Sequence, residues 1–200
     1  MNLCSATTSS RLTAGFPLRN TVLTRDGCCW YAVYTWARHE KVVARQLEER
    51  GVAHFLPLHQ AIHRWSKRWV RVSLPLFPGY VFVQTNAQNR HQALQVPGVV
   101  HYVGTGAAPC PIPDDEIECL RKVLLSGEKV GPHPYLSPGN SVRIASGPLA
   151  GLCGVIERTK SGSRFIISVE LIKRSVAVEL DGCHLAAVQL SPALGWGPAS

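Results

Sequence analysis

Two groups of titratable side chains have types and spacings that could support catalysis or metal binding. His59 and His63 lie four residues apart, a spacing that brings two metal ligands together on a helix but not on a strand. The surrounding residues predict a strand, and no Asp or Glu occurs between residues 51 and 113. The acidic run 114–116 could imitate a paired-carboxylate site, but the helix dipole alone favours such a run at a helix start. With no Gly-rich phosphate loop or nucleophile elbow present, we expect no metal, no cofactor and no enzymatic activity.

A second candidate is the basic segment 63–71, HRWSKRWVR, which interleaves cations with two tryptophans. Arg64, Lys67, Arg68 and Arg71 could track phosphates, while an indole can stack on a base for roughly 1–3 kcal/mol without reading sequence. The pattern therefore predicts a single-stranded nucleic acid site at a hairpin tip. The alternative is that both indoles close the hairpin by cross-strand packing, worth roughly 0.2–1 kcal/mol. The sequence leaves both readings open.

A third candidate is the aromatic segment 75–83, PLFPGYVFV. On a strand, Val81 and Val83 point to one side, and Tyr80 and Phe82 to the other. If helices cover only one side of the sheet, one of these sets faces outward, and an outward aromatic row is typical of a protein-docking surface. Packing of these rings in a core is the alternative.

Composition and charge agree with a folded binding protein. The chain has 200 residues, of which 46% are hydrophobic, and a formal net charge of +8 with a pI near 9.4, which favours a polyanionic partner. Seven cysteines, an odd number without zinc-knuckle spacing, predict reduced thiols in a cytoplasm. No apolar run is long enough to span a bilayer, and the first 26 residues lack the hydrophobic core of a secretory signal. We expect a cytoplasmic monomer without membrane contact.

Hydrophobic periodicity places these candidates on an α/β unit over residues 28–126. It predicts strands at 30–36, 54–65, 69–76, 80–84 and 99–103, and helices at 40–50, at 86–95 and from Pro113 onward. Gly51 is placed to end the first helix. Residues 127–138 are rich in Gly and Pro and predict a linker. Five short strands within 139–190 predict a small all-β barrel of the SH3 kind. Residues 1–27 are expected to be a disordered extension and 191–200 a flexible tail, so the fold class is α+β.

The order of these motifs resembles the NusG family of transcription elongation factors. WYAVYTW, PLFPGYVFVQ, VPGVVHYVG and PDDEIECL resemble the family's N-terminal (NGN) domain, and PGNSVRIASGPLAGLCGVI with SVELIKRSVAVEL resembles its C-terminal KOW domain. The aromatic segment and the basic hairpin are closer to the operon-selective, RfaH-like branch, which includes capsule-locus antiterminators. The resemblance covers about Trp30 to Val188.

The resemblance implies four contact sites. The clamp helices of the polymerase β′ subunit would bind a row made of Tyr34, Phe77, Tyr80 and Phe82. The β subunit would meet His91 and Gln92, although Gln92 and Ala93 replace the threonines of the branch's motif. Non-template DNA would pass Arg38 and His39. Rho or a small-subunit ribosomal protein would bind the segment Leu171, Ile172, Lys173 and Arg174, with Ile172 where an aromatic is usual.

These sites together predict a transcription elongation or antitermination factor. Its N-terminal domain would bind RNA polymerase and suppress pausing or termination, and its KOW domain would recruit a partner. The alternative function is that of a general RNA-binding, ribosome-associated KOW protein.

Overall fold

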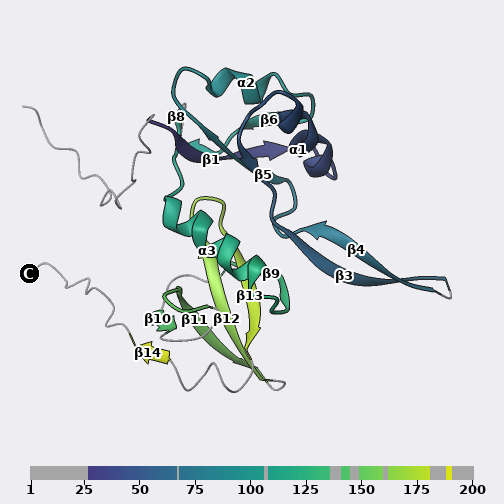
Figure 1. The fold of residues 1–200 in the computed structure, drawn as a ribbon, viewed down its shortest axis with the longest axis vertical. Helices are drawn as coiled ribbons and strands as arrows, with labels where there is room; N and C mark the ends of the chain where they lie inside the picture. The colour runs from purple at the N-terminus through teal and green to yellow at the C-terminus, as the bar shows by residue number, and fades with distance from the viewer. Residues whose placement is uncertain are drawn as a thin grey trace, which may run out of the picture.

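The computed structural model describes residues 27–66, 68–105, 108–135, 141–144, 149–159, 162–180 and 188–190. The N-terminal unit runs in the order β1 (Cys29–Thr35), α1 (Glu40–Glu49), β2 (His54–Phe55), β3 (Leu58–Trp65), β4 (Arg68–Pro75), β5 (Tyr80–Thr85), α2 (Arg90–Leu94), β6 (Val99–Tyr102), β7 (Gly104–Thr105), β8 (Ala108–Pro109) and α3 (Asp114–Leu125). The C-terminal unit contains β9 (Val130–His133), β10 (Ser141–Ile144), β11 (Cys153–Thr159), β12 (Gly162–Val169), β13 (Arg174–Leu180) and β14 (Val188–Leu190). The fold is α+β, as predicted (Figure 1). The tail at 191–200 and all but the last residue of the expected extension lie outside the described residues.

A four-stranded antiparallel sheet with the order β2-β5-β1-β6 forms the centre of the N-terminal unit. Strand alternation gives the sheet two different faces. On one face Tyr31 and Val33 pack with Val43 and Leu47 of α1 and with the α2 region. On the other face Trp30 and Ala32 join Phe82, which pairs with Ala32 across the strands. The predicted separation of Val81 and Val83 from Phe82 is therefore confirmed.

Helix α1 forms where the apolar spacing predicts it. Val43 and Leu47 are buried on the face toward the sheet, while Arg45 and Glu49 form an exposed i,i+4 pair at 3.6 Å. The helix ends before Gly51, whose φ of +70° is the left-handed conformation that glycine adopts without a steric penalty.

Strands β3 and β4 form a two-stranded sheet of their own. In Figure 1 this hairpin projects away from both units. The strands pair from Leu58↔Pro75 at the base to Trp65↔Arg68 at the tip. This register places the turn directly after Trp65, where the sequence predicts it.

The C-terminal unit is a six-stranded antiparallel sheet with the order β14-β10-β11-β12-β13-β9. Strand β9 is formed by residues that the sequence assigns to a linker, so part of that prediction is wrong. Val130 pairs with Val178 and Pro132 with Val176, because the edge of β13 offers backbone partners that local sequence does not reveal. Pro132 is tolerated because β9 lies at the sheet edge.

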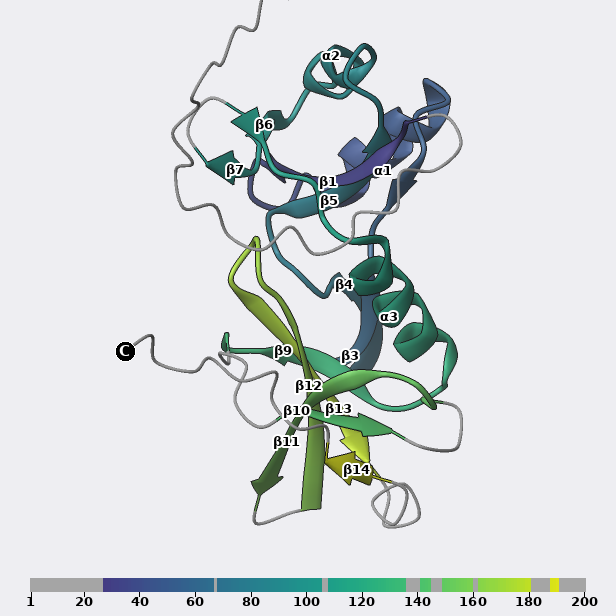
Figure 2. The same ribbon diagram turned by 90° about the vertical axis from the view of Figure 1, so that its left-hand side faces the viewer.

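Helix α3 lies between the two units, as the two views in Figures 1 and 2 show. Ile117 and Leu120 pack in a cluster with the second face of the N-terminal sheet. Val123, one turn further, packs instead with the core of the C-terminal sheet, which includes Phe165 and Val178. A helix that the sequence assigns to the N-terminal unit therefore also closes the core of the C-terminal unit.

Candidate functional site

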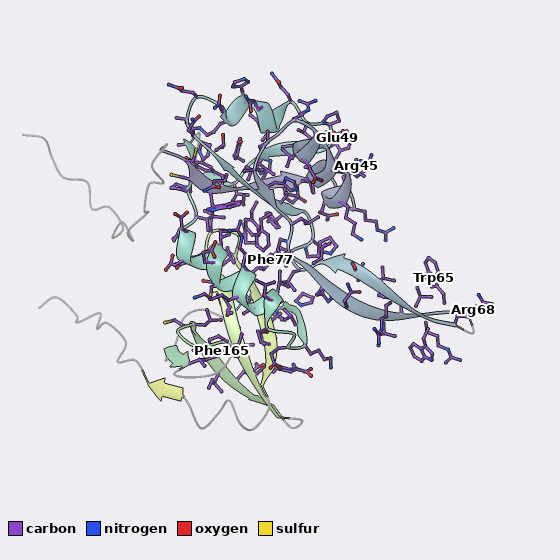
Figure 3. All side chains as sticks on the ribbon, viewed as in Figure 1. Arg45, Glu49, Trp65, Arg68, Phe77 and Phe165 are labelled. Carbon is purple, nitrogen blue, oxygen red and sulfur yellow. The ribbon has the colours of Figure 1, made fainter. Side chains whose placement is uncertain are left out.

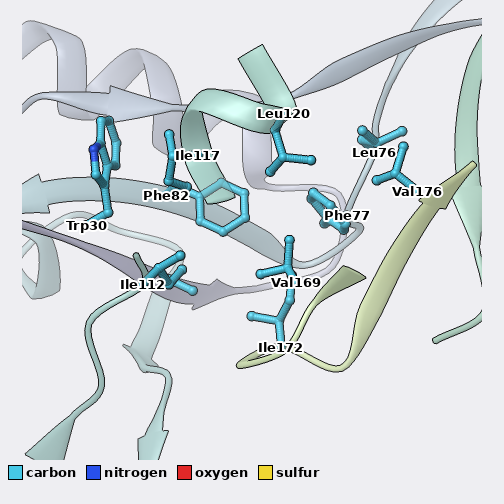
Figure 4. Packing of buried hydrophobic residues seen from close by; sticks show 11 residues of the cluster. Trp30, Leu76, Phe77, Phe82, Ile112, Ile117, Leu120, Val169, Ile172 and Val176 are labelled. Carbon is cyan, nitrogen blue, oxygen red and sulfur yellow. The ribbon is translucent and has the colours of Figure 1, made fainter. Parts of the chain in front are cut away.

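The aromatic row lies on the sheet face opposite α1 and α2, but only part of it is exposed. Tyr34 is 40% exposed and Tyr80 is half-buried, whereas Phe77 and Phe82 are 1% and 0% exposed. The expectation that the row faces outward is therefore wrong for Phe77 and Phe82. The physical reason is a long-range contact, since Ile172 and other residues of the C-terminal unit pack in the same cluster (Figure 4).

The rings of the row contact one another in edge-to-face geometry. Tyr34 and Tyr80 lie with ring centroids 5.4 Å apart at 63°, and Phe77 and Phe82 lie 5.8 Å apart at 87°. Such arrangements are the ones aromatic quadrupoles prefer. Phe55 of β2 extends the row by stacking on Phe82 at 6.2 Å. Tyr34, Phe77, Tyr80 and Phe82 thus form one continuous cluster, of which Tyr34 and Tyr80 reach the solvent.

Glu40 orients the turn that carries this row, and sequence reasoning missed it. The side chain is buried, and its Oε1 accepts a hydrogen bond of 2.7 Å from the Gly79 amide. Gly79 has a φ of +85°, and a Cβ there would lie 3.1 Å from Cε2 of Tyr34. The Thr35 amide donates back to the Gly79 carbonyl at 2.9 Å. The sequence shows an acidic residue at a helix start and a Pro-Gly turn 39 residues later, and nothing local connects the two.

The segment predicted to bind a C-terminal partner divides into two halves. Leu171 and Ile172 pack against the aromatic cluster, with Ile172 only 4% exposed. Lys173 and Arg174 are exposed, and the Lys173 ammonium lies 4.9 Å from the Tyr135 ring. The two predicted protein-binding surfaces therefore cover each other across their apolar parts. Figure 4 shows Ile172 and Val169 facing Phe77 and Phe82.

Two further predicted contact sites are accessible. His91 and Gln92 are exposed on α2, where Nδ1 of His91 lies 2.9 Å from the Gln88 carbonyl. At the corner between β1 and α1, Arg38 is exposed with a φ of +64°. His39 is half-buried beneath the exposed Trp36, edge to face at 5.5 Å.

The basic hairpin presents its predicted cations to solvent. Arg64, Arg68 and Arg71 are exposed, while Lys67 lies outside the described residues. The tryptophans Trp65 and Trp69 are 74% and 70% exposed. Each indole pairs across the strands with an arginine, and the Arg64 guanidinium lies 5.8 Å from the centroid of the Trp69 ring, so cross-strand packing and exposure occur together at Trp69.

The residues considered for catalysis lie on two elements, His59 and His63 on β3 and the acidic run 114–116 in the first turn of α3. Among the described residues, no group of three His, Cys, Asp or Glu side chains could hold a metal ion. Burial lowers the pKa of His59, and burial, followed by the charges of Asp115 and Glu118, raises the pKa of Asp114. Asp114 lies in the first turn of α3, where acidic residues are favoured by the helix dipole. Within the described part of the chain, no helix is long and apolar enough to cross a membrane.

Comparison with known proteins gives a consistent result. A family model described as "Transcription termination factor nusG" matches residues 28–121. The Pseudomonas aeruginosa protein named "Transcription termination/antitermination protein NusG" is 33% identical over 166 residues, which cover 76% of this chain and 94% of that protein. The protein of the same name from Escherichia coli K12 is 31% identical and covered to 92%. The solved structure described as "Domain interaction in Thermotoga maritima NusG" matches 82% of this chain and 97% of its own, with a TM-score of 0.49 and 23% identity.

Proposed function

Because the chain belongs to the NusG family of transcription termination and antitermination factors, we propose that it acts by binding RNA polymerase through its N-terminal sheet. The observation that carries this proposal is the continuous row of Tyr34, Phe77, Tyr80 and Phe82 on the face opposite α1 and α2. A cluster of aromatic side chains with a half-exposed rim is the kind of surface that dominates protein interfaces. Its partner is the pair of clamp helices of the β′ subunit.

A second contact bridges to the β subunit through His91 and Gln92, which are exposed on α2. By holding both sides of the polymerase cleft, the protein suppresses pausing or premature termination. It works in the cytoplasm as a monomer, without catalysis and without a cofactor. The exposed Arg38 and the adjacent His39 are positioned at one corner of the unit for non-template DNA.

The C-terminal unit recruits a partner, Rho or a small-subunit ribosomal protein, through Leu171, Ile172, Lys173 and Arg174. Since Ile172 packs in the same cluster as Phe77 and Phe82, the two units must separate before either surface is fully available. A polymerase that binds only the separated form shifts the population toward it. Separation then leaves the C-terminal unit tethered nearby, so even a weak partner is bound at high effective concentration.

The test is the affinity of the full-length protein for core bacterial RNA polymerase. Tyr34→Ala and Tyr80→Ala are preferable to changes at Phe77, because truncating a buried Phe costs roughly 3–5 kcal/mol of stability. If these residues are interface anchors, each should weaken binding by roughly 30-fold or more, the effect of losing about 2 kcal/mol. Val42→Ala, at an exposed position on α1, is the matched control. Unchanged affinity in both tyrosine variants would remove this surface from the proposal.

A parallel titration with free RNA separates this function from the alternative. A general RNA-binding protein should bind RNA tightly without polymerase affinity, and its binding should weaken steeply as salt rises. The exposed basic hairpin is the feature that makes this comparison necessary.

A further inference from the structure

The β3–β4 hairpin carries one indole on each of its two faces. Directly paired residues of an antiparallel hairpin lie on the same face. Arg64 pairs with Trp69, whereas Trp65 pairs with Arg68. The two tryptophans therefore lie on opposite faces, each beside an arginine from the other strand. Figure 3 shows Trp65 and Arg68 at the far end of the hairpin, well away from Phe77.

The face that contains Trp69 has two arginines near its indole, and we call it the Trp69 face. Its outer members are Ile62, Arg64, Trp69 and Arg71, all of them exposed, with Ile62 paired to Arg71. The Arg64 guanidinium lies 5.8 Å from the centroid of the Trp69 ring. Arg71 follows Trp69 by two residues, which on a strand is about 6.6 Å. The indole therefore has two arginines beside it, one directly across the strands and one two residues along its own strand.

The opposite face has fewer arginines beside its indole. Beside Trp65 it presents Arg68 as its one arginine near the tip, followed by His63 and Val70. An imidazole lacks the forked set of donors that a guanidinium offers to a phosphate. The chain therefore contains its own matched comparison, with one indole beside two arginines and another beside a single arginine.

Within the described part of the chain, the arginines of the hairpin have no acidic partner. None of the ion pairs there involves Arg64, Arg68 or Arg71. The sequence contains no acidic residue between positions 51 and 113, so none can come from the hairpin itself. Exposed guanidiniums favour a ligand with negative charge, and a solvent-exposed indole favours a ligand with a planar ring.

We propose that the Trp69 face binds single-stranded nucleic acid. One base stacks on the Trp69 ring, and the phosphates on either side of that nucleotide contact Arg64 and Arg71. Arg64 already lies against the indole, so the site loses little side-chain freedom when the strand binds. A duplex would not fit this mode, because its bases are stacked on one another and unavailable to the ring.

The experiment measures binding of the full-length protein to short fluorescent oligonucleotides of mixed sequence by anisotropy. The probes are single-stranded RNA, single-stranded DNA of the same sequence, and the duplex DNA. Trp69→Ala should raise the dissociation constant for a single strand roughly 5- to 150-fold, and Trp69→Phe should retain most of the affinity. Trp65→Ala, on the opposite face and equally exposed, should leave it unchanged. Circular dichroism verifies that each variant is folded.

Salt dependence tests the phosphate contacts separately. Arg71→Gln should reduce the slope of log affinity against log salt by about 0.7, the value for one phosphate contact on a single strand. Arg45→Gln, at an exposed position of α1 outside the hairpin, should leave that slope unchanged. A preference for RNA or for DNA would support the proposal and identify the strand.

Three results would overturn it: no single-strand binding at low salt, duplex binding as tight as single-strand binding, or an equal loss in Trp65→Ala and Trp69→Ala. Because the probes are free oligonucleotides, none of these results depends on whether the protein binds polymerase.

Discussion

Single residues set the local geometry of the proposed docking row. Glu40 is the clearest example, because a carboxylate is buried in order to hold one backbone amide. Gly79 accepts this arrangement since it alone tolerates a φ of +85° without a clash between a Cβ and the Tyr34 ring. The position of Tyr34, the most exposed ring of the row, thus depends on two residues that do not belong to it.

Replacement of Glu40 by alanine should lower the free energy of unfolding by roughly 1–3 kcal/mol, because the buried Gly79 amide loses its charged acceptor. Glu48→Ala, at an exposed position of the same helix, is the matched control and should change stability little. Urea unfolding monitored by circular dichroism gives both values. Equal stability of the two variants would show that the hydrogen bond contributes nothing.

The Cys119 thiol should make stability depend on pH in the alkaline range. Burial, and next the neighbouring Cys153, raise the pKa of Cys119 to about 12 from the ordinary value of 9.0. As the pH rises above the ordinary value, the unfolded chain loses this proton before the folded one does. The free energy of unfolding should therefore fall with rising pH until the folded pKa is reached. Cys119→Val should flatten this fall relative to the wild type, whereas Cys153→Val, at an exposed position, should flatten it less, because burial of Cys119 is the larger cause and remains. Parallel curves for all three proteins would contradict the prediction.

At the scale of elements, the β3–β4 hairpin depends on its turn. Two residues separate the paired Trp65 and Arg68, and the first of them, Ser66, has a φ of +53°. Tight hairpin turns favour positive φ, but a residue with a Cβ is strained there. The turn length also determines the proposed nucleic acid site, because it is what places Trp65 and Trp69 on opposite faces.

Ser66→Gly should therefore stabilise the hairpin by up to about 1 kcal/mol, because it relieves the strain of the positive φ. The greater conformational entropy of glycine in the unfolded chain reduces this gain. Ser73→Gly, within β4, should have the opposite effect, because glycine weakens a strand interior. Amide hydrogen exchange of β3 and β4 would measure both local opening free energies. Faster exchange in Ser66→Gly would mean that the turn is not strained.

At the scale of the whole molecule, the decisive feature is the contact between the units. The face that carries the aromatic row is covered by α3 and by Val169, Ile172 and Val176 of the C-terminal sheet. The same contact removes the apolar half of the proposed partner-binding segment from solvent. Availability of the two surfaces is therefore coupled.

Ile172→Asp should separate the units, because even truncation of a buried Ile to Ala costs roughly 2–5 kcal/mol and a carboxylate would be buried without a partner. Ile172 belongs to the shared cluster and not to the cluster that forms the core of the C-terminal sheet, so that sheet should stay folded. We expect faster amide exchange in β5 and tighter polymerase binding. Lys173→Asp, exposed in the same turn, is the control. Unaltered exchange and affinity in Ile172→Asp would mean that the contact does not limit access.

Local sequence was sufficient wherever the determining interactions are local. Apolar spacing predicted α1 and its end at Gly51, alternation separated Val81 and Val83 from Phe82, and the two-residue turn set the hairpin register. These features depend on residues a few positions apart, so the local sequence contains the information that sets them. The α+β class and the NusG family followed from the same motifs.

Tertiary structure alone decided the features that join distant parts of the chain. Phe77 and Phe82 are buried because residues of α3 and, far along the sequence, Val169, Ile172 and Val176 pack in the same cluster. Strand β9 forms within a Gly- and Pro-rich segment because the edge of β13 supplies hydrogen-bond partners. Glu40 is buried because a glycine amide on another loop meets its carboxylate. A local pattern predicts which faces are apolar or charged. It does not predict which distant part of the chain will cover those faces, because burial depends on the contacts of the whole fold.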